Sequence, residues 1–137
     1  MPFEHSWLVP HRICIVRYNG ILSIEDVRAV VNIAEQYIAQ AGTNPVHFIH
    51  DHTRTEKVNI RLKEAVEAMR LMLGTPRVGW NISVNPASNM MEHFVTTVVN
   101  QVTGVRNQRV DTLEEALEFL CEMDDGVNTA LKHLKAG

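Results

Sequence analysis

The chain has 137 residues and a mass of 15.5 kDa, which suits one domain with a single hydrophobic core. Its 45% hydrophobic and 21% charged residues are typical of a globular protein and exclude a disordered chain. A net charge of −3 argues against nucleic acid and anionic membrane surfaces as partners, and no apolar run approaches the ~18 residues that span a bilayer.

The chain opens with the pattern of a β-hairpin. Two runs of β-branched or aromatic residues, 6–9 and 12–18, are separated by Pro10 and His11. The second strand is predicted to end at residues 19–20, an Asn-Gly pair that tolerates positive φ.

A helix is predicted to follow this hairpin. Ser23 can accept a hydrogen bond from the free backbone N–H groups of the first turn, where Glu25 and Asp26 suit the helix dipole. Apolar residues then recur at three-four spacing until Gly42 ends the helix.

The middle of the chain alternates between strand and helix patterns. We predict a strand over 46–51, a polar loop over 52–59, and a helix over 62–73 with Asn59 as its N-cap. Strict alternation over 77–84 predicts the next strand, with one face less apolar than the other.

The last third continues the alternation. A third helix is predicted over 85–102, and a short strand at the sheet edge over 105–110. Thr112 and Glu115 stand at capping-box spacing before a helix over 113–121.

This order of elements predicts an α/β fold with a mixed five-stranded sheet. Right-handed crossovers make four strands parallel, and the first strand pairs antiparallel with the second only. Residues 1–137 form one domain that ends in a helical tail over about 124–137. Whether residues 113–135 form one kinked helix or two stays open.

Several segments resemble the STAS domain family, whose fold is that of anti-sigma-factor antagonists. The resemblance spans most of the chain and rests on Ile13–Tyr18, Asn19-Gly20, Ile21-Leu22-Ser23, Glu25-Asp26, Phe48-Ile49-His50-Asp51 and Leu113–Leu120. It implies a bacterial, cytoplasmic regulatory module without chemistry of its own, which binds a protein partner or a small molecule and has a homodimer as one possible state.

The resemblance does not extend to the phosphorylation motif of the family. Members that are switched by phosphorylation carry an Asp-Ser-Ser-Gly-like stretch before the second helix, whereas residues 52–61 here contain no Ser and no Gly. Thr53 and Thr55 supply hydroxyl groups in this stretch, and local backbone hydrogen bonding explains both.

The candidate ligand or partner surface lies at the carboxyl ends of the parallel strands, where α/β sheets bind their ligands. We assign to it Asn19, His50, Asp51, His52, Thr53, Arg54, Asn85 and Ser88. No catalytic residue, metal site or cofactor is assigned.

An alternative function, a metal-binding protein or a hydrolase-like enzyme, would use His50, Asp51 and His52. The two histidines share one face of a strand and could bind a divalent metal, but zinc needs at least a third protein ligand. Asp51 points to the opposite face, so it is poorly placed to orient either imidazole. We also predict that replacing His50 and His52 by Ala leaves folding intact.

Overall fold

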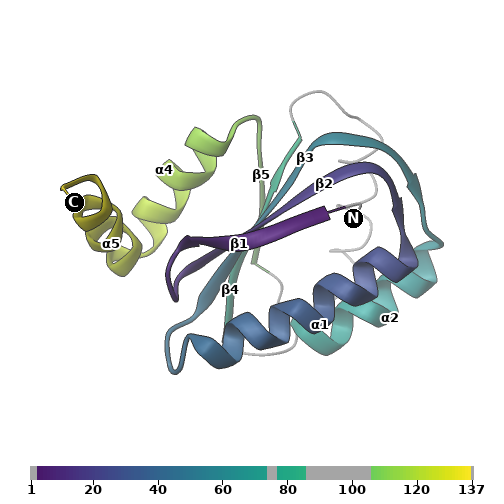
Figure 1. Cartoon of the computed structure of the whole chain (residues 1–137), viewed down its shortest axis with the longest axis horizontal. Coiled ribbons are helices and arrows are strands. Elements are labelled where there is room, and N and C mark those ends of the chain that lie inside the picture. Colours follow the sequence, from purple (N-terminus) through teal and green to yellow (C-terminus); the bar gives the residue numbers. More distant parts are fainter. Residues whose placement is uncertain (1–2, 74–76, 86–105, 137) are drawn as a thin grey trace.

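The computed structural model describes residues 3–73, 77–85 and 106–136, which form a five-stranded sheet with helices on both faces (Figure 1). The strands follow the order β1-β2-β3-β4-β5, with β1 and β2 antiparallel and all other neighbours parallel. The predicted fold class is thus confirmed. The elements are β1 Phe3–Val9, β2 Ile13–Ser23, α1 Ile24–Gln40, β3 Val46–Asn59, α2 Leu62–Leu73, β4 Val78–Val84, β5 Arg106–Val110, α4 Leu113–Met123 and α5 Asp125–Ala136.

The two faces of the sheet carry two separate apolar cores, because alternate residues of a strand point to opposite faces. Helix α1 packs its buried stripe on one face, together with Cys14, Val16 and Phe48 from the central strands. Helices α4 and α5 cover the other face near the β1–β2 turn, over Ile13 and Ile49. Beyond the reach of α4 and α5, no other helix among the described residues covers this second face.

The helix caps predicted at Ser23 and Thr112 are present. Ser23 Oγ accepts the Asp26 backbone N–H, and the Asp26 carboxylate accepts the Ser23 N–H at 2.9 Å, which completes a capping box on α1. Thr112 caps α4 in the same way, but the Glu115 carboxylate accepts from the N–H of Asp111, one residue before the cap. Each helix start is therefore encoded locally.

Two predicted boundaries were wrong, because β2 and β3 are longer than their apolar runs. The second strand continues past Gly20 to Ser23, and residues 54–59 pair with it in parallel instead of forming a loop. Gly20 has a φ of 81° and marks an irregularity in the pairing where we predicted a strand end. Asn59 is the last residue of β3, so it is not the cap of α2.

The segment 113–135, for which the sequence leaves open one kinked helix or two helices, forms two helices. Helix α4 ends at Met123, and Asp124 has an extended backbone with φ −143° and ψ 106° before α5 begins. Of the predicted helix over 85–102, only Asn85 lies within the described residues. None of the helices described is long and apolar enough to cross a membrane.

Candidate functional site

A pocket of about 420 Å³ lies where β2 and β3 extend beyond α4. Its polar lining comes from Glu4, Arg17, Asn19, Asp51, Thr53 and Arg54, which we call the polar shelf. The buried residues Phe3 and Tyr18 complete the lining. Four of the eight residues predicted for the binding surface, Asn19, Asp51, Thr53 and Arg54, are thus brought together.

The strand register arranges the charges of the polar shelf in a row. Glu4 of β1 is paired with Arg17 of β2, and Arg17 is paired on its other side with Asp51 of β3. Asn19 and Arg54 form the next matched pair toward the carboxyl ends. A base therefore stands between two acids, and a second base lies further along β3.

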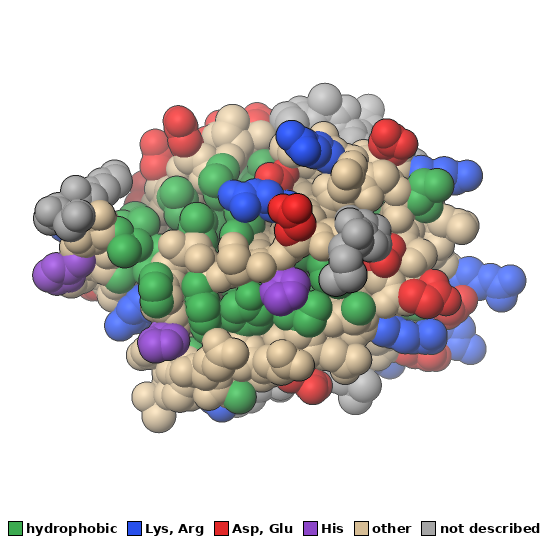
Figure 2. Space-filling view, in the orientation of Figure 1, with side chains coloured by type: hydrophobic (Ala, Val, Ile, Leu, Met, Phe, Trp, Pro, Cys, Tyr) green, Lys and Arg blue, Asp and Glu red, His purple; other side chains and the backbone are tan. Residues whose placement is uncertain are grey.

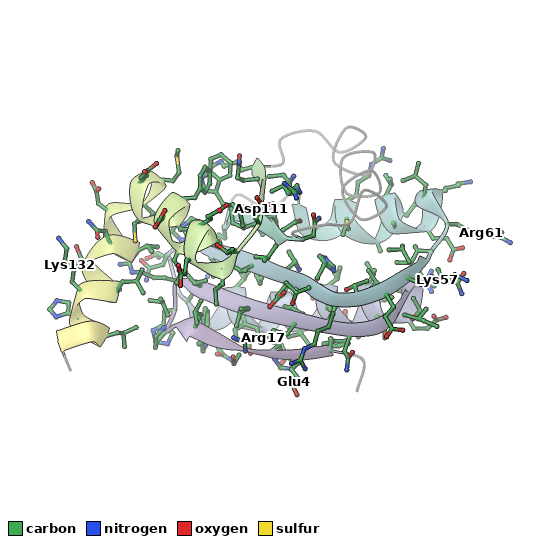
Figure 3. The ribbon with its side chains drawn as sticks, turned by 90° about the horizontal axis from the view of Figure 1, so that it is seen from above. Glu4, Arg17, Lys57, Arg61, Asp111 and Lys132 are labelled. Carbon is green, nitrogen blue, oxygen red and sulfur yellow. The ribbon has the colours of Figure 1, made fainter. Side chains whose placement is uncertain are left out.

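The charged groups of the polar shelf face solvent. Asp51 Oδ1 accepts the backbone N–H of Thr53 at 3.0 Å, whereas Glu4, Arg17 and Arg54 form no side-chain hydrogen bond or ion pair with other described residues. Figure 2 shows basic and acidic side chains next to each other near the middle of the visible face. In Figure 3, Glu4 and Arg17 lie close together on one side of the sheet, far from Lys57 and Arg61 at its end. Polar groups for recognition are thus available at this surface.

His50 and His52 do not belong to the polar shelf. They lie on the opposite face of β3, where the ring of Tyr18 stacks on His52 with centroids 4.5 Å apart. Nε2 of His50 lies 3.4 Å from Asn81 Oδ1, so it donates there and accepts the Tyr18 hydroxyl at Nδ1, 2.9 Å away. The two histidines therefore belong to a polar cluster on the covered face of β3, in which His52 is buried and His50 is partly buried. His52 was predicted in a loop, but this segment is a strand with one covered face.

Burial sets the ionisation of this cluster. Desolvation lowers the pKa of His50 to about 4, although its hydrogen bond to Asn81 acts in the opposite direction. Desolvation also lowers the pKa of His52 to about 3, and the neighbouring His50 adds to the effect. Both imidazoles are neutral at pH 7, and burial raises the pKa of the Tyr18 hydroxyl above its usual value.

The geometry does not assemble the alternative site of His50, Asp51 and His52. The two imidazole rings are stacked with centroids 6.4 Å apart, and the Asp51 carboxylate is on the other face of the sheet. In the part of the chain that the structure describes, no group of three or more His, Cys, Asp or Glu side chains could hold a metal ion.

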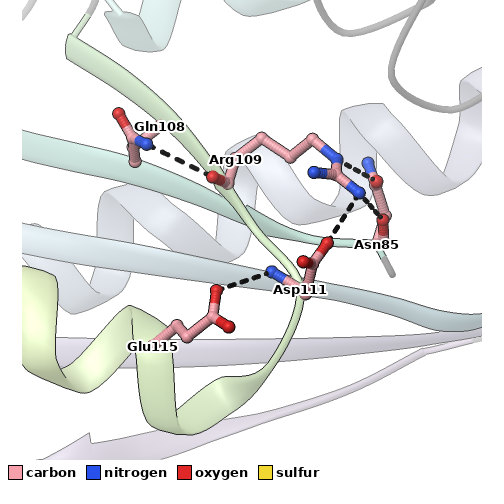
Figure 4. Close-up of polar contacts among 5 residues, drawn as sticks. All are labelled: Asn85, Gln108, Arg109, Asp111 and Glu115. Carbon is pink, nitrogen blue, oxygen red and sulfur yellow. Dashed lines mark hydrogen bonds and ion pairs between the residues drawn. The ribbon is translucent and has the colours of Figure 1, made fainter. Parts of the chain in front are cut away.

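Asn85 holds the end of β4 in place (Figure 4). Nε of Arg109 donates to Asn85 Oδ1 at 2.9 Å, and the same guanidinium donates to the Asn85 carbonyl and to Asp111 Oδ1, each at 2.8 Å. Asn85 is only 2% exposed, so the structure assigns it a structural role. Ser88, the remaining predicted site residue, lies outside the described residues.

Glu4 and Arg17 belong to the polar shelf but were not predicted as site residues from the sequence. A signal for Arg17 was present, because it is the one charged residue in the otherwise apolar run from Ile13 to Tyr18. Such a residue on a central strand indicates an uncovered part of the sheet. Glu4 gives no comparable signal, because only the strand register reveals that it faces Arg17.

The order of the elements, the mixed sheet and the helices on its two faces define an α/β domain with the STAS-like fold predicted from the sequence. No family model and no curated protein matches the sequence.

Solved structures share this fold. The anti-sigma factor antagonist SpoIIAA in its unphosphorylated form is 22% identical over 86% of this chain and 96% of its own, with a TM-score of 0.52. The Bacillus cell fate determinant SpoIIAA in its phosphorylated form is 19% identical over 86% and 98%, with a TM-score of 0.55. An uncharacterized DUF3478-family protein from Shewanella loihica, with a SpoIIAA-like fold, is 18% identical over 87% and 92%, with a TM-score of 0.59. The chain therefore has the SpoIIAA-like fold.

Proposed function

We propose that this chain is a non-enzymatic regulatory module of the STAS type, which acts in the cytoplasm by binding a ligand or partner at the polar shelf. The observation that carries the proposal is a pocket on β1, β2 and β3 in which Glu4, Arg17 and Arg54 form no side-chain hydrogen bond or ion pair with other described residues. Three charged groups left free beside one another are available for intermolecular contacts.

The likeness to SpoIIAA supports the regulatory part of the proposal. SpoIIAA is an anti-sigma factor antagonist known in phosphorylated and unphosphorylated forms. The present chain offers no serine between Asp51 and Leu62, so we propose control by binding and not by phosphorylation of this segment. A protein partner, a small molecule and a second copy of the chain are all compatible with such a module.

The local chemistry also favours binding over catalysis. The only carboxylate next to the two histidines in sequence, Asp51, is separated from them by the sheet, and both imidazoles are held neutral in a packed cluster. A general base must reach its proton within hydrogen-bonding distance, and these groups face away from the pocket.

The proposal can be tested with the tagged full-length chain expressed in the organism that encodes it. Arg17→Ala with Arg54→Ala removes both bases of the polar shelf, and Lys57→Ala with Arg61→Ala removes two exposed bases elsewhere. We call Arg17→Ala/Arg54→Ala the shelf pair and Lys57→Ala/Arg61→Ala the control pair. We expect native mass spectrometry of the purified complexes to detect a bound component on the wild type and on the control pair, but not on the shelf pair.

A thermal melt of each variant establishes that it is folded. A component that binds equally to all three proteins would place the binding surface elsewhere, and the proposed role of the polar shelf would then be wrong.

A further inference from the structure

The charges at the polar shelf are balanced and spatially separated. Neighbouring strands lie about 4.8 Å apart, so the register places Glu4 and Asp51 on either side of Arg17, with roughly 10 Å between their backbones. Arg54 lies beyond this row, three residues after Asp51 on β3, beside Asn19 of β2 and Thr53 of its own strand. The pocket thus has a base flanked by two acids at one end and a base with two neutral polar groups at the other.

This distribution of charged side chains disfavours ligands whose charges all have the same sign. A ligand with anionic groups alone would approach two carboxylates, and a ligand with cationic groups alone would approach two guanidinium groups. A molecule with one group of each sign avoids both conflicts, because its cation can lie against Asp51 while its anion lies against Arg54. The two acids and two bases leave the pocket without net charge, which matches such a ligand.

The size of the pocket limits the ligand. About 420 Å³ lies at the lower end of the range of roughly 300 to 1,000 Å³ for small-molecule sites. An amino acid or a dipeptide fits this volume, and Asn19 and Thr53 can provide hydrogen bonds to its neutral polar atoms.

We infer that the polar shelf binds a small zwitterion of amino-acid or dipeptide type, with its ammonium group at Asp51 and its carboxylate at Arg54, three residues further along β3. This inference rests on the proposed function, because it names the ligand class of the same surface. Arg17 lies between the two acids in the strand register, so it is less well placed than Arg54 to bind the carboxylate.

The test is an NMR titration of the ¹⁵N-labelled full chain with three probes. The probes are alanylalanine, its N-acetyl form, which lacks the ammonium group, and its C-terminal amide, which lacks the carboxylate. We expect alanylalanine to shift the backbone amide signals of Arg17, Asp51 and Arg54, and each blocked form to bind about tenfold more weakly, a difference of about 1.4 kcal/mol.

Two variants assign the two ends of the ligand. With Arg54→Ala, alanylalanine and its C-terminal amide should bind equally, because the partner of the carboxylate is gone. With Asp51→Asn, which keeps the oxygen that accepts from Thr53, alanylalanine and its N-acetyl form should approach one another in affinity. Lys57→Ala is the control and should leave all three affinities unchanged.

The inference is overturned if all three probes bind the wild type equally, or if none shifts these amides at about 10 mM, a concentration that detects binding as weak as about 1 mM. If the probes fail while the shelf pair still loses a bound component that the control pair retains, the proposed function stands with a different ligand class. If the shelf pair also retains the component, both proposals fail.

Discussion

Nε2 of His47 lies 2.8 Å from Oδ2 of Asp124, a residue 77 positions further along the chain. The other ring nitrogen of His47, Nδ1, accepts the backbone N–H of Trp80 at 2.9 Å, so the proton of the imidazole is on Nε2 and is donated to Asp124. The His47 side chain thereby satisfies a β4 amide where the β3–β4 register shifts, and it ties the sheet to the start of α5.

Asp124 also caps α5. Its Oδ1 accepts the backbone N–H of Gly126 at 2.9 Å and that of Val127 at 3.4 Å. Burial by itself would raise the pKa of Asp124, but the hydrogen bond from His47 and these two backbone donors together bring that pKa below its usual value.

We expect Asp124→Ala to lower the free energy of unfolding by about 2 to 4 kcal/mol, because it removes a helix cap and leaves a buried N–H of His47 unpaired. Urea denaturation measures the loss. The control is Thr129→Ala, an exposed position on α5 that should change stability by less than about 0.5 kcal/mol. Equal stability of the two variants would contradict a structural role for the His47–Asp124 contact.

The backbone at Gly79 leaves room for the His47 ring. A Cβ atom at this position would stand 2.3 Å from His47 Nδ1, so the ring must move and lose its contact with Trp80. We expect Gly79→Ala to destabilise the protein by about 2 to 4 kcal/mol. Gly42→Ala is the comparison, because Gly42 has open space around it and only its φ of 68° opposes a side chain, for a cost of about 1 kcal/mol. Guanidinium chloride midpoints should rank wild type, Gly42→Ala and Gly79→Ala in descending order.

His50 is partly buried and packs against Tyr18 and Phe48, so we no longer expect that its loss leaves folding intact. In His50→Ala, the Tyr18 hydroxyl loses its partner and a cavity opens beside the Phe48 ring, so we expect a loss of about 2 to 4 kcal/mol. Thr53→Ala, three residues along the same strand and exposed, should change stability by less than about 0.5 kcal/mol. A thermal melt that finds His50→Ala as stable as Thr53→Ala would refute the buried cluster.

Stability should fall as the pH decreases from about 7 to about 4.5. The folded-state pKa values of His50 and His52, about 4 and about 3, lie below the ordinary 6.5, so over this range the unfolded chain binds protons that the folded chain does not. We expect a loss on the order of 2 kcal/mol per histidine between pH 7 and pH 5, measured by urea denaturation at each pH.

The contribution of Asp124 belongs to a lower pH range. Its lowered pKa adds stability above the ordinary carboxylate pKa, and this stability is lost only as the pH falls through the folded-state value. The change in stability between pH 7 and pH 5 is therefore assigned to the histidines. His50→Gln should reduce the slope of the unfolding free energy against pH in this range, and an unchanged slope would show that His50 is not the titrating group.

The sequence by itself determined the order of elements, because periodicity and capping are local properties of the chain. The oxygens of Ser23 and Thr112 lie within three residues of the amides that they cap, so both helix starts could be predicted. The short turn at Pro10 and His11 indicated a hairpin, and with it that β1 pairs with β2 only.

Tertiary structure alone decided the extent of the strands and the residues of the site. The polar residues 54–59 carry no strand periodicity of their own, and they pair because β2 continues alongside them and satisfies their backbone groups. That strand has a covered face, which buries His52, and an open face, which exposes Thr53. The row of Glu4, Arg17 and Asp51 joins three strands, and its geometry depends on a register that a shift of one residue would abolish.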